Sequence, residues 1–217
     1  TRLHTDKLLE IFTHLCSAEE QEIKSFFELL WKTRYQFDRW VVKWMEQDKE
    51  NEELRLTYVS HSRSGNHWYI NRSQKEINAL TLLQSVRLFT GERSAQYWLT
   101  PFLGRLLEQP CDNEQQVLAL LEKIDNELSM AADNETQKSV SFKQAKLESV
   151  SLKKWAEMRM YFSENHGTRF EHYWFQKLEF LLWKSYQPEW KDNPRFKKYR
   201  ITAKNSVEHV YPQQEEY

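Results

Sequence analysis

Glycine and proline are scarce in this sequence, with four Gly and five Pro among 217 residues. Tight turns between strands rely on these residues, so their scarcity argues against a β-sandwich or a β-barrel. Cysteine is rarer still, because the chain has only Cys16 and Cys111, which match no metal-binding spacing. Two unpaired thiols are typical of a reducing compartment, and we therefore expect a cytoplasmic protein.

Long apolar runs and common catalytic signatures are also missing. No stretch approaches the roughly 20 apolar residues of a membrane-spanning helix, and the polar first ten residues do not resemble a signal peptide. The sequence contains no GxxxxGK[ST], GxGxxG or HExxH pattern, which removes the usual signals of nucleotide binding and of zinc proteases. We expect no membrane association.

The residues that are abundant favour helices around a large core. Hydrophobic residues make up 40% of the chain and aromatic residues 14%, which is enough apolar surface for a sizeable core. Leu, Glu, Lys and Gln are frequent and have high helix propensity. We predict a mainly α fold, an irregular helical bundle with a short β segment at the C-terminus, where residues 199–203 and 207–212 look extended.

Apolar periodicity and capping residues predict where the helices lie. One long helix is expected over about 18–47, and another begins near Ser73 and ends at Gly91. A capping box at Thr168–Glu171 predicts the start of a strongly apolar helix. Residues 54–71 fit either a small hairpin or an irregular loop. Further helices are expected over 94–109 with a restart at Pro101, after Asp112, and over 149–163.

A polar stretch without periodicity, 131–141, suggests an internal boundary. We predict a helical domain over 1–132, a linker over 133–150, and a helical segment over 151–217 that leads into the extended C-terminal runs.

Charge is unevenly distributed although the net charge is only −1. Residues 108–135 contain eight acidic side chains, among them Asp125, and one basic side chain. Residues 191–204 contain one acidic side chain, Asp192, and six basic ones: Lys191, Arg195, Lys197, Lys198, Arg200 and Lys204. This pattern predicts opposite potentials at two ends of the fold, or simply two solvated faces.

The run Glu208-His209-Val210-Tyr211-Pro212 pairs a carboxylate with a histidine in an extended segment. Hydrolysis of a phosphodiester needs a base to activate water and a cation to neutralise developing charge. A carboxylate beside a histidine can supply a metal ligand and a base, if the backbone bends so that both side chains face one site. The alternative is an exposed polar pair in a tail.

Several stretches together resemble the GmrSD-type restriction endonucleases. They are Thr90–Glu92, Gln96–Phe102, Tyr173–Lys184, Tyr199–Thr202 and Ser206–Gln213, so that the resemblance extends from about residue 75 to the end. This family joins an N-terminal nucleotide-hydrolysing module, a helical region and a C-terminal HNH nuclease, a ββα-metal fold, and restricts invading DNA.

The resemblance implies a role for each residue of the motif. It makes Glu208 a metal ligand and His209 the general base, with Mg²⁺ or Mn²⁺ as the cofactor and DNA as the partner. The family's Asp-Gly-Gln-Gln-Arg motif and the second half of its HNH pattern are absent from these residues. We therefore expect the helical middle and the beginning of the nuclease domain, a fragment inactive by itself.

The basic residues of 191–204 precede the motif directly. Beside a nuclease centre they would hold DNA phosphates, a contact that is independent of sequence. The aromatic residues Trp190, Phe196 and Tyr199 are interleaved with them. In the alternative interpretation these aromatic residues belong to the core and the lysines only solubilise the surface. Two other functions stay open: a non-catalytic interaction or dimerisation module, which would include a homo-oligomer, and a helical nucleic-acid-binding domain without hydrolysis.

Overall fold

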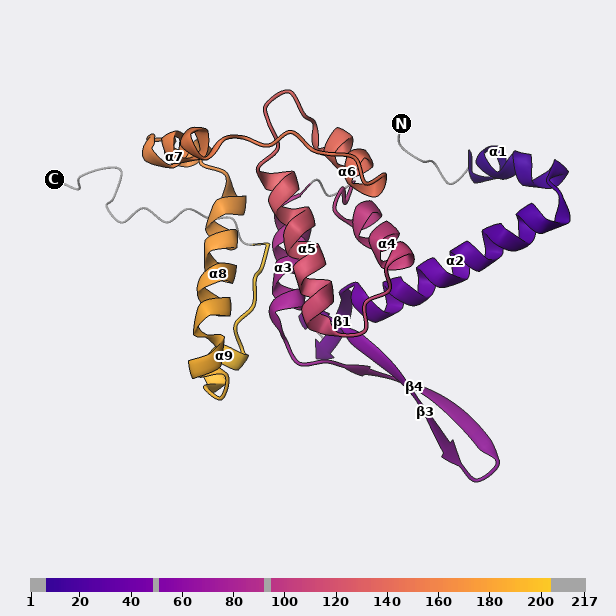
Figure 1. Cartoon of the computed structure of the whole chain (residues 1–217). Coiled ribbons are helices and arrows are strands. Elements are labelled where there is room, and N and C mark those ends of the chain that lie inside the picture. Colours follow the sequence, from indigo (N-terminus) through magenta and orange to yellow (C-terminus); the bar gives the residue numbers. More distant parts are fainter. Residues whose placement is uncertain (1–6, 49–50, 92–94, 204–217) are drawn as a thin grey trace.

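The computed structural model describes residues 7–48, 51–91 and 95–203 (Figure 1). Within these ranges the chain is mainly α-helical, as predicted, and two antiparallel two-stranded sheets accompany the helices. No helix there is long and apolar enough to cross a membrane. The elements are α1 (Leu8–Phe12), η2 (Thr13–Ser17), α2 (Glu20–Trp40), β1 (Lys43–Asp48), β2 (Asn51–Arg55), β3 (Thr57–Ser64), β4 (His67–Gln74), α3 (Ala79–Thr90), α4 (Leu99–Glu108), α5 (Glu114–Ser129), α6 (Gln137–Ala145), α7 (Trp155–Ser163), η3 (Gly167–Arg169), α8 (His172–Trp190) and α9 (Pro194–Lys197).

Helix α3 lies at the centre of the core. Every residue from Leu80 to Arg87 is buried, and a helix that is buried on all sides must be surrounded by other elements. It packs against α5, α8 and β2, and Figure 1 shows α5 and α8 on either side of it. The predicted apolar positions Leu80, Leu83 and Val86 are all buried in it, but the helix begins at Ala79 and not near Ser73, which lies in β4.

Helix α2 ends at Trp40, so the prediction of one helix to about residue 47 is wrong. The β-branched Val41 and Val42 follow, and β-branched side chains favour extended backbone. The buried side chain of Gln84 then fixes this end of the helix from α3. Its Oε1 accepts from the Val42 N–H at 3.0 Å, and its Nε2 donates to the Trp40 carbonyl at 2.8 Å. The chain continues as strand β1.

Strands β3 and β4 form an antiparallel ribbon from the pair Thr57 and Gln74 to the pair Ser64 and His67. The turn has Gly65 at φ +59° in its first central position, as in a type II′ turn, whose twist matches that of the strands. The hairpin interpretation of residues 54–71 is therefore confirmed, and the loop alternative is wrong. Figure 1 shows the ribbon projecting away from the helical body.

The segment 133–150, expected to be an exposed linker, instead contains helix α6. Val140 of α6 is fully buried, and α6 packs against α4 and α5. The linker prediction is wrong because the buried side chains of Val140, Ser141 and Gln144 dock this helix. The core combines side chains from both sides of this segment, from Trp40 to Ile201.

Other predicted helix starts also shift, and the helix expected over 149–163 begins only at Trp155. Helix α8 begins at His172, with Glu171 at the N-cap and no side-chain cap, while Thr168 belongs to η3. The predicted capping box is therefore wrong. Helix α4 begins at Leu99 rather than at Pro101, which sits in the first turn, where a missing N–H sacrifices no helical hydrogen bond.

Residues 199–203, expected to be strand-like, form no strand in the described part of the chain. The Tyr199 N–H donates to the Phe196 carbonyl at the end of α9, and the Thr202 carbonyl accepts from the Gln176 side chain. A helix end and a side chain therefore satisfy part of this backbone. The second extended run, 207–212, lies outside the described residues, so the ββα-metal motif stays a prediction.

Candidate nucleic-acid interface

Five of the six predicted phosphate-binding residues lie in the described part of the chain. Lys191 follows α8, Arg195 and Lys197 lie on α9, and Lys198 and Arg200 come directly after it. Lys204, Glu208 and His209 lie outside the described residues. The structure therefore brings the basic residues together at one end of α8 and leaves the two predicted nuclease residues unplaced.

Four of these basic side chains belong to exposed residues: Lys191, Arg195, Lys197 and Lys198. Lys197 lies 3.6 Å from Asp192, and an exposed pair of this kind contributes little and is screened by salt. Exposed cations close together can exchange their counterions for DNA phosphates. A role for these four residues in phosphate binding stays a prediction.

Arg200 is placed differently, because its guanidinium is already engaged. Its Nε donates to Glu53 Oε2 of β2 at 3.0 Å, and its Nη1 donates to the carbonyls of Lys197 and Tyr199, both at 2.8 Å. Burial alone would raise the pKa of Glu53, but hydrogen bonds from Arg200 and Arg55 outweigh burial and hold that pKa below its ordinary value. Arg200 therefore links the C-terminal segment to β2.

Neighbouring side chains anchor the same segment to α8. Ile201 is only 6% exposed and belongs to the core. Phe196 stacks on Trp183 with ring centroids 5.0 Å apart, and the Tyr199 hydroxyl donates to Glu179 at 2.8 Å. Burial, and then this hydrogen bond, raise the pKa of Tyr199. Tyr199 thus packs against the core, as the alternative interpretation expected, whereas Trp190 is 51% exposed and does not.

A groove of about 590 Å³ lies between α8 and the beginnings of α3 and α5. Lys184, Lys191 and Lys197 line one part of it, and Glu114 lines another. Glu114, from the acidic segment, is already bound by Lys75 and by Asn78. Residues from both charged segments therefore line one groove, and opposite potentials at two ends of the fold stay a prediction.

A charge centre at the middle of the fold was not predicted from the sequence. Asp125 of α5 was counted with the acidic surface, yet it is fully buried. Its carboxylate accepts hydrogen bonds from Arg87 of α3 and from Lys177 and Tyr173 of α8. Burial raises the pKa of the Tyr173 hydroxyl, which therefore stays protonated and donates to Asp125 at 3.0 Å.

A signal for this centre was present in the sequence. Asp125 shares the apolar face of α5 with Leu121 and Leu128, and Lys177 shares that of α8 with Tyr173 and Phe180. A charged residue on an apolar face is rarely buried unless it is paired. Opposite charges on two such faces could have been matched to each other.

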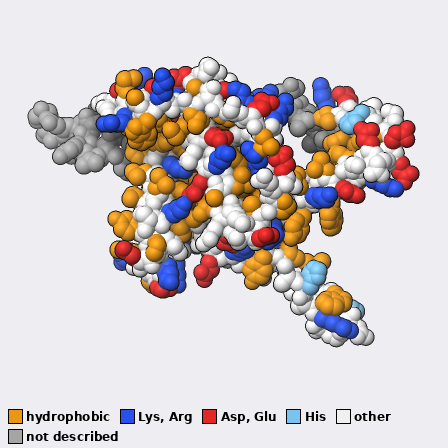
Figure 2. All heavy atoms as spheres, in the orientation of Figure 1, with side chains coloured by type: hydrophobic (Ala, Val, Ile, Leu, Met, Phe, Trp, Pro, Cys, Tyr) orange, Lys and Arg blue, Asp and Glu red, His pale blue; other side chains and the backbone are white. Residues whose placement is uncertain are grey.

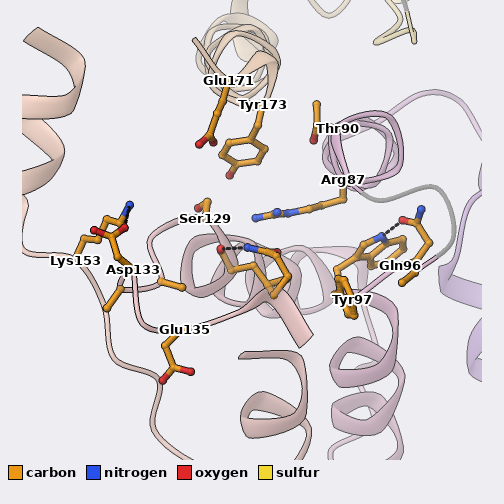
Figure 3. A pocket seen from close by; sticks show the side chains of 17 residues that line it. Arg87, Thr90, Gln96, Tyr97, Ser129, Asp133, Glu135, Lys153, Glu171 and Tyr173 are labelled. Atoms are coloured by element: carbon orange, nitrogen blue, oxygen red, sulfur yellow. Dashed lines mark hydrogen bonds and ion pairs between the residues drawn. The ribbon is translucent and has the colours of Figure 1, made fainter. Parts of the chain in front are cut away.

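A cavity of about 380 Å³ adjoins this charge centre (Figure 3). Arg87 and Tyr173 form its inner wall, with the guanidinium 4.6 Å from the centre of the tyrosine ring. On the outer side Asp133 pairs with Lys153 at 2.8 Å, and Glu135 accepts from Ser139 and Lys143. These charges are compensated within the protein, and the described residues that line the cavity give it polar walls.

The metal that the resemblance implies would be bound at Glu208, which lies outside the described residues. In ranges 7–48, 51–91 and 95–203, no group of three or more His, Cys, Asp or Glu side chains is placed to hold a metal ion. Comparisons with protein-family models, with curated proteins and with solved structures gave no match. The GmrSD resemblance therefore rests on the residues that carry it.

Proposed function

We propose that this chain is the helical scaffold, and the entry into the HNH nuclease, of a GmrSD-like endonuclease that restricts foreign DNA in the cytoplasm. The observation that supports it best is the anchored segment ahead of Glu208 and His209. Contacts from β2 and α8 hold residues 196–202 against the body. A catalytic segment needs this kind of support, since displacing catalytic groups by about 1 Å can lower the reaction rate by about a hundredfold.

The exposed basic residues before the motif give the scaffold a second task. Lys191, Arg195, Lys197 and Lys198 would bind the DNA backbone close to the point of cleavage, without reading its sequence. A divalent cation, Mg²⁺ or Mn²⁺, would be bound in the nuclease domain that Glu208 opens. The free cysteines Cys16 and Cys111 fit a reducing cytoplasm.

The proposal is tested by plasmid cleavage with the full-length protein that contains these residues. Wild type, His209→Ala and a control, His14→Ala, are compared with Mg²⁺ or Mn²⁺ and the nucleotide present. His14 is exposed on η2, far from the motif in sequence. We expect metal-dependent nicking that only His209→Ala loses. Equal cleavage by all three proteins, or cleavage by none, contradicts the proposal.

A non-catalytic interaction module is the second candidate, and the apolar surface of α2 favours it. Phe27, Leu30 and Trp31 are all more than half exposed and lie at helical spacing on this projecting helix. Contiguous exposed apolar residues commonly mark contact sites between proteins. Sedimentation of wild type and Trp31→Ala separates the candidates. If the chain is an interaction module, wild type sediments as an oligomer, Trp31→Ala weakens that oligomer, and the full-length protein does not cleave DNA.

A further inference from the structure

The ribbon formed by β3 and β4 is an exposed arm of unusual composition. From Thr57 to Gln74 it contains no Asp, Glu or Lys, although the whole chain has 32 acidic residues among 217. Its cations are Arg63 and Arg72, and nearly every residue of both strands is exposed. Figure 2 shows hydrophobic, basic and histidine side chains on the projecting ribbon, and no acidic ones on this face.

The strand register sorts these residues onto two faces. Directly paired residues share a face, so Arg63 lies with Trp68, and His61 with Ile70. The guanidinium of Arg63 stands 5.8 Å from the Trp68 ring centre. The opposite face carries mainly hydroxyl and amide groups, with these members: Tyr58, Ser60, Ser62, Ser64, His67, Tyr69, Asn71 and Ser73. Asn71 Nδ2 donates to the Ser62 hydroxyl at 2.8 Å there.

The two arginines differ in how free they are. Arg72, near the base, lies 3.9 Å from Asp38 of α2. Arg63, near the tip, donates its Nε to the Gly65 carbonyl at 3.0 Å, and no carboxylate within the described residues pairs with it. The positive charge of the ribbon is therefore directed to its outer end, which is the part that a partner reaches first.

We propose that this ribbon binds duplex DNA by entering the major groove. That groove is about 12 Å wide and admits a two-stranded ribbon, and strands of this length reach about 25 Å from the body. Hydroxyl and amide groups on one face can hydrogen-bond base edges or phosphates, while Arg63 supplies charge complementarity. The ribbon carries no carboxylate that would repel the phosphates of DNA.

This inference rests on the proposed DNA-binding function and adds a contact separate from the basic residues at α9. The test measures fluorescence anisotropy of a labelled duplex of about 30 base pairs with the full-length protein, without divalent metal so that no cleavage occurs. Arg63→Ala/Trp68→Ala is compared with Trp155→Ala/Arg159→Ala on α7. Trp68 and Trp155 are matched controls because their exposed fractions are 68% and 67%. Neither double variant removes a core side chain.

We expect the ribbon variant to lose at least tenfold in affinity and to show a shallower dependence on salt, because a phosphate contact is removed. The control should stay within about twofold of wild type. Wild-type affinity in the ribbon variant, or binding of single-stranded DNA alone, overturns the inference. Neither result would affect the proposed function, whose test is the cleavage lost in His209→Ala.

Discussion

The buried carboxylate of Asp125 should be the most sensitive polar position of the fold. Its partners Arg87 and Lys177 come from two other helices, and their side chains are only 9% and 10% exposed. Asp125→Asn keeps the size of the side chain but leaves both cations buried without an anion. Breaking a buried ion pair in this way costs about 3–5 kcal/mol, a large part of the roughly 5–15 kcal/mol that stabilises a domain.

Urea unfolding followed by tryptophan fluorescence measures this loss. With a slope of about 2 kcal/mol per molar urea, the midpoint of Asp125→Asn should fall by about 1.5–2.5 M. Asp133→Asn is the matched control, because its side chain is 92% exposed and pairs with Lys153 at 2.8 Å. An exposed pair contributes about 1 kcal/mol or less, so the control midpoint should hardly move.

A double variant tests the reason for the loss. Asp125→Asn leaves two cations buried without a partner, and Lys177→Met removes one of them. The double variant should therefore lose less free energy of unfolding than the sum of the two single changes. A loss below about 1 kcal/mol in Asp125→Asn would refute the reasoning, as would strict additivity in the double variant.

Two further predictions concern the end of α2. Gln84→Leu should cost about 2–4 kcal/mol, because the Val42 N–H and the Trp40 carbonyl lose their buried partner, and an unchanged urea midpoint would contradict this. Burial, only partly offset by Asp38, lowers the pKa of Lys43 from 10.5 to about 8. The unfolded chain therefore binds more protons between these values, and stability should rise from pH 8 to pH 10. Lys43→Met should flatten this rise in urea unfolding at both pH values, and equal slopes in the two proteins would speak against a buried cation.

The helices of the core were predictable because their pattern is local. Leu80, Leu83 and Val86 repeat at helical spacing, and α3 lies where they indicate. The end of α2 was not predictable in the same way, since Val41 and Trp44 continue the apolar pattern beyond Trp40. The chain turns there because Gln84, which is distant in sequence, binds the backbone on both sides of the turn.

The candidate site was predictable only in part for a related reason. A run of basic residues such as 191–204 is visible in the sequence, but the engagement of Arg200 by Glu53 joins residues far apart in the chain. Asp125 looked like a surface charge because its partners lie on other helices. The position of Arg63 at the tip depends on the register of the two strands. The sequence does not determine this register, because it fits both a hairpin and a loop.

The anchored segment ahead of Glu208 carries the central claim, and cleavage by anchor variants tests it most directly. Single-turnover plasmid cleavage and DNA affinity would be measured for the full-length protein carrying Ile201→Ala or Gln176→Ala, with Leu181→Ala, half-exposed on α8, as the control. The account predicts that both anchor variants cleave at least tenfold more slowly while binding DNA normally, and that the control is unaffected. Wild-type cleavage rates in both anchor variants would contradict it.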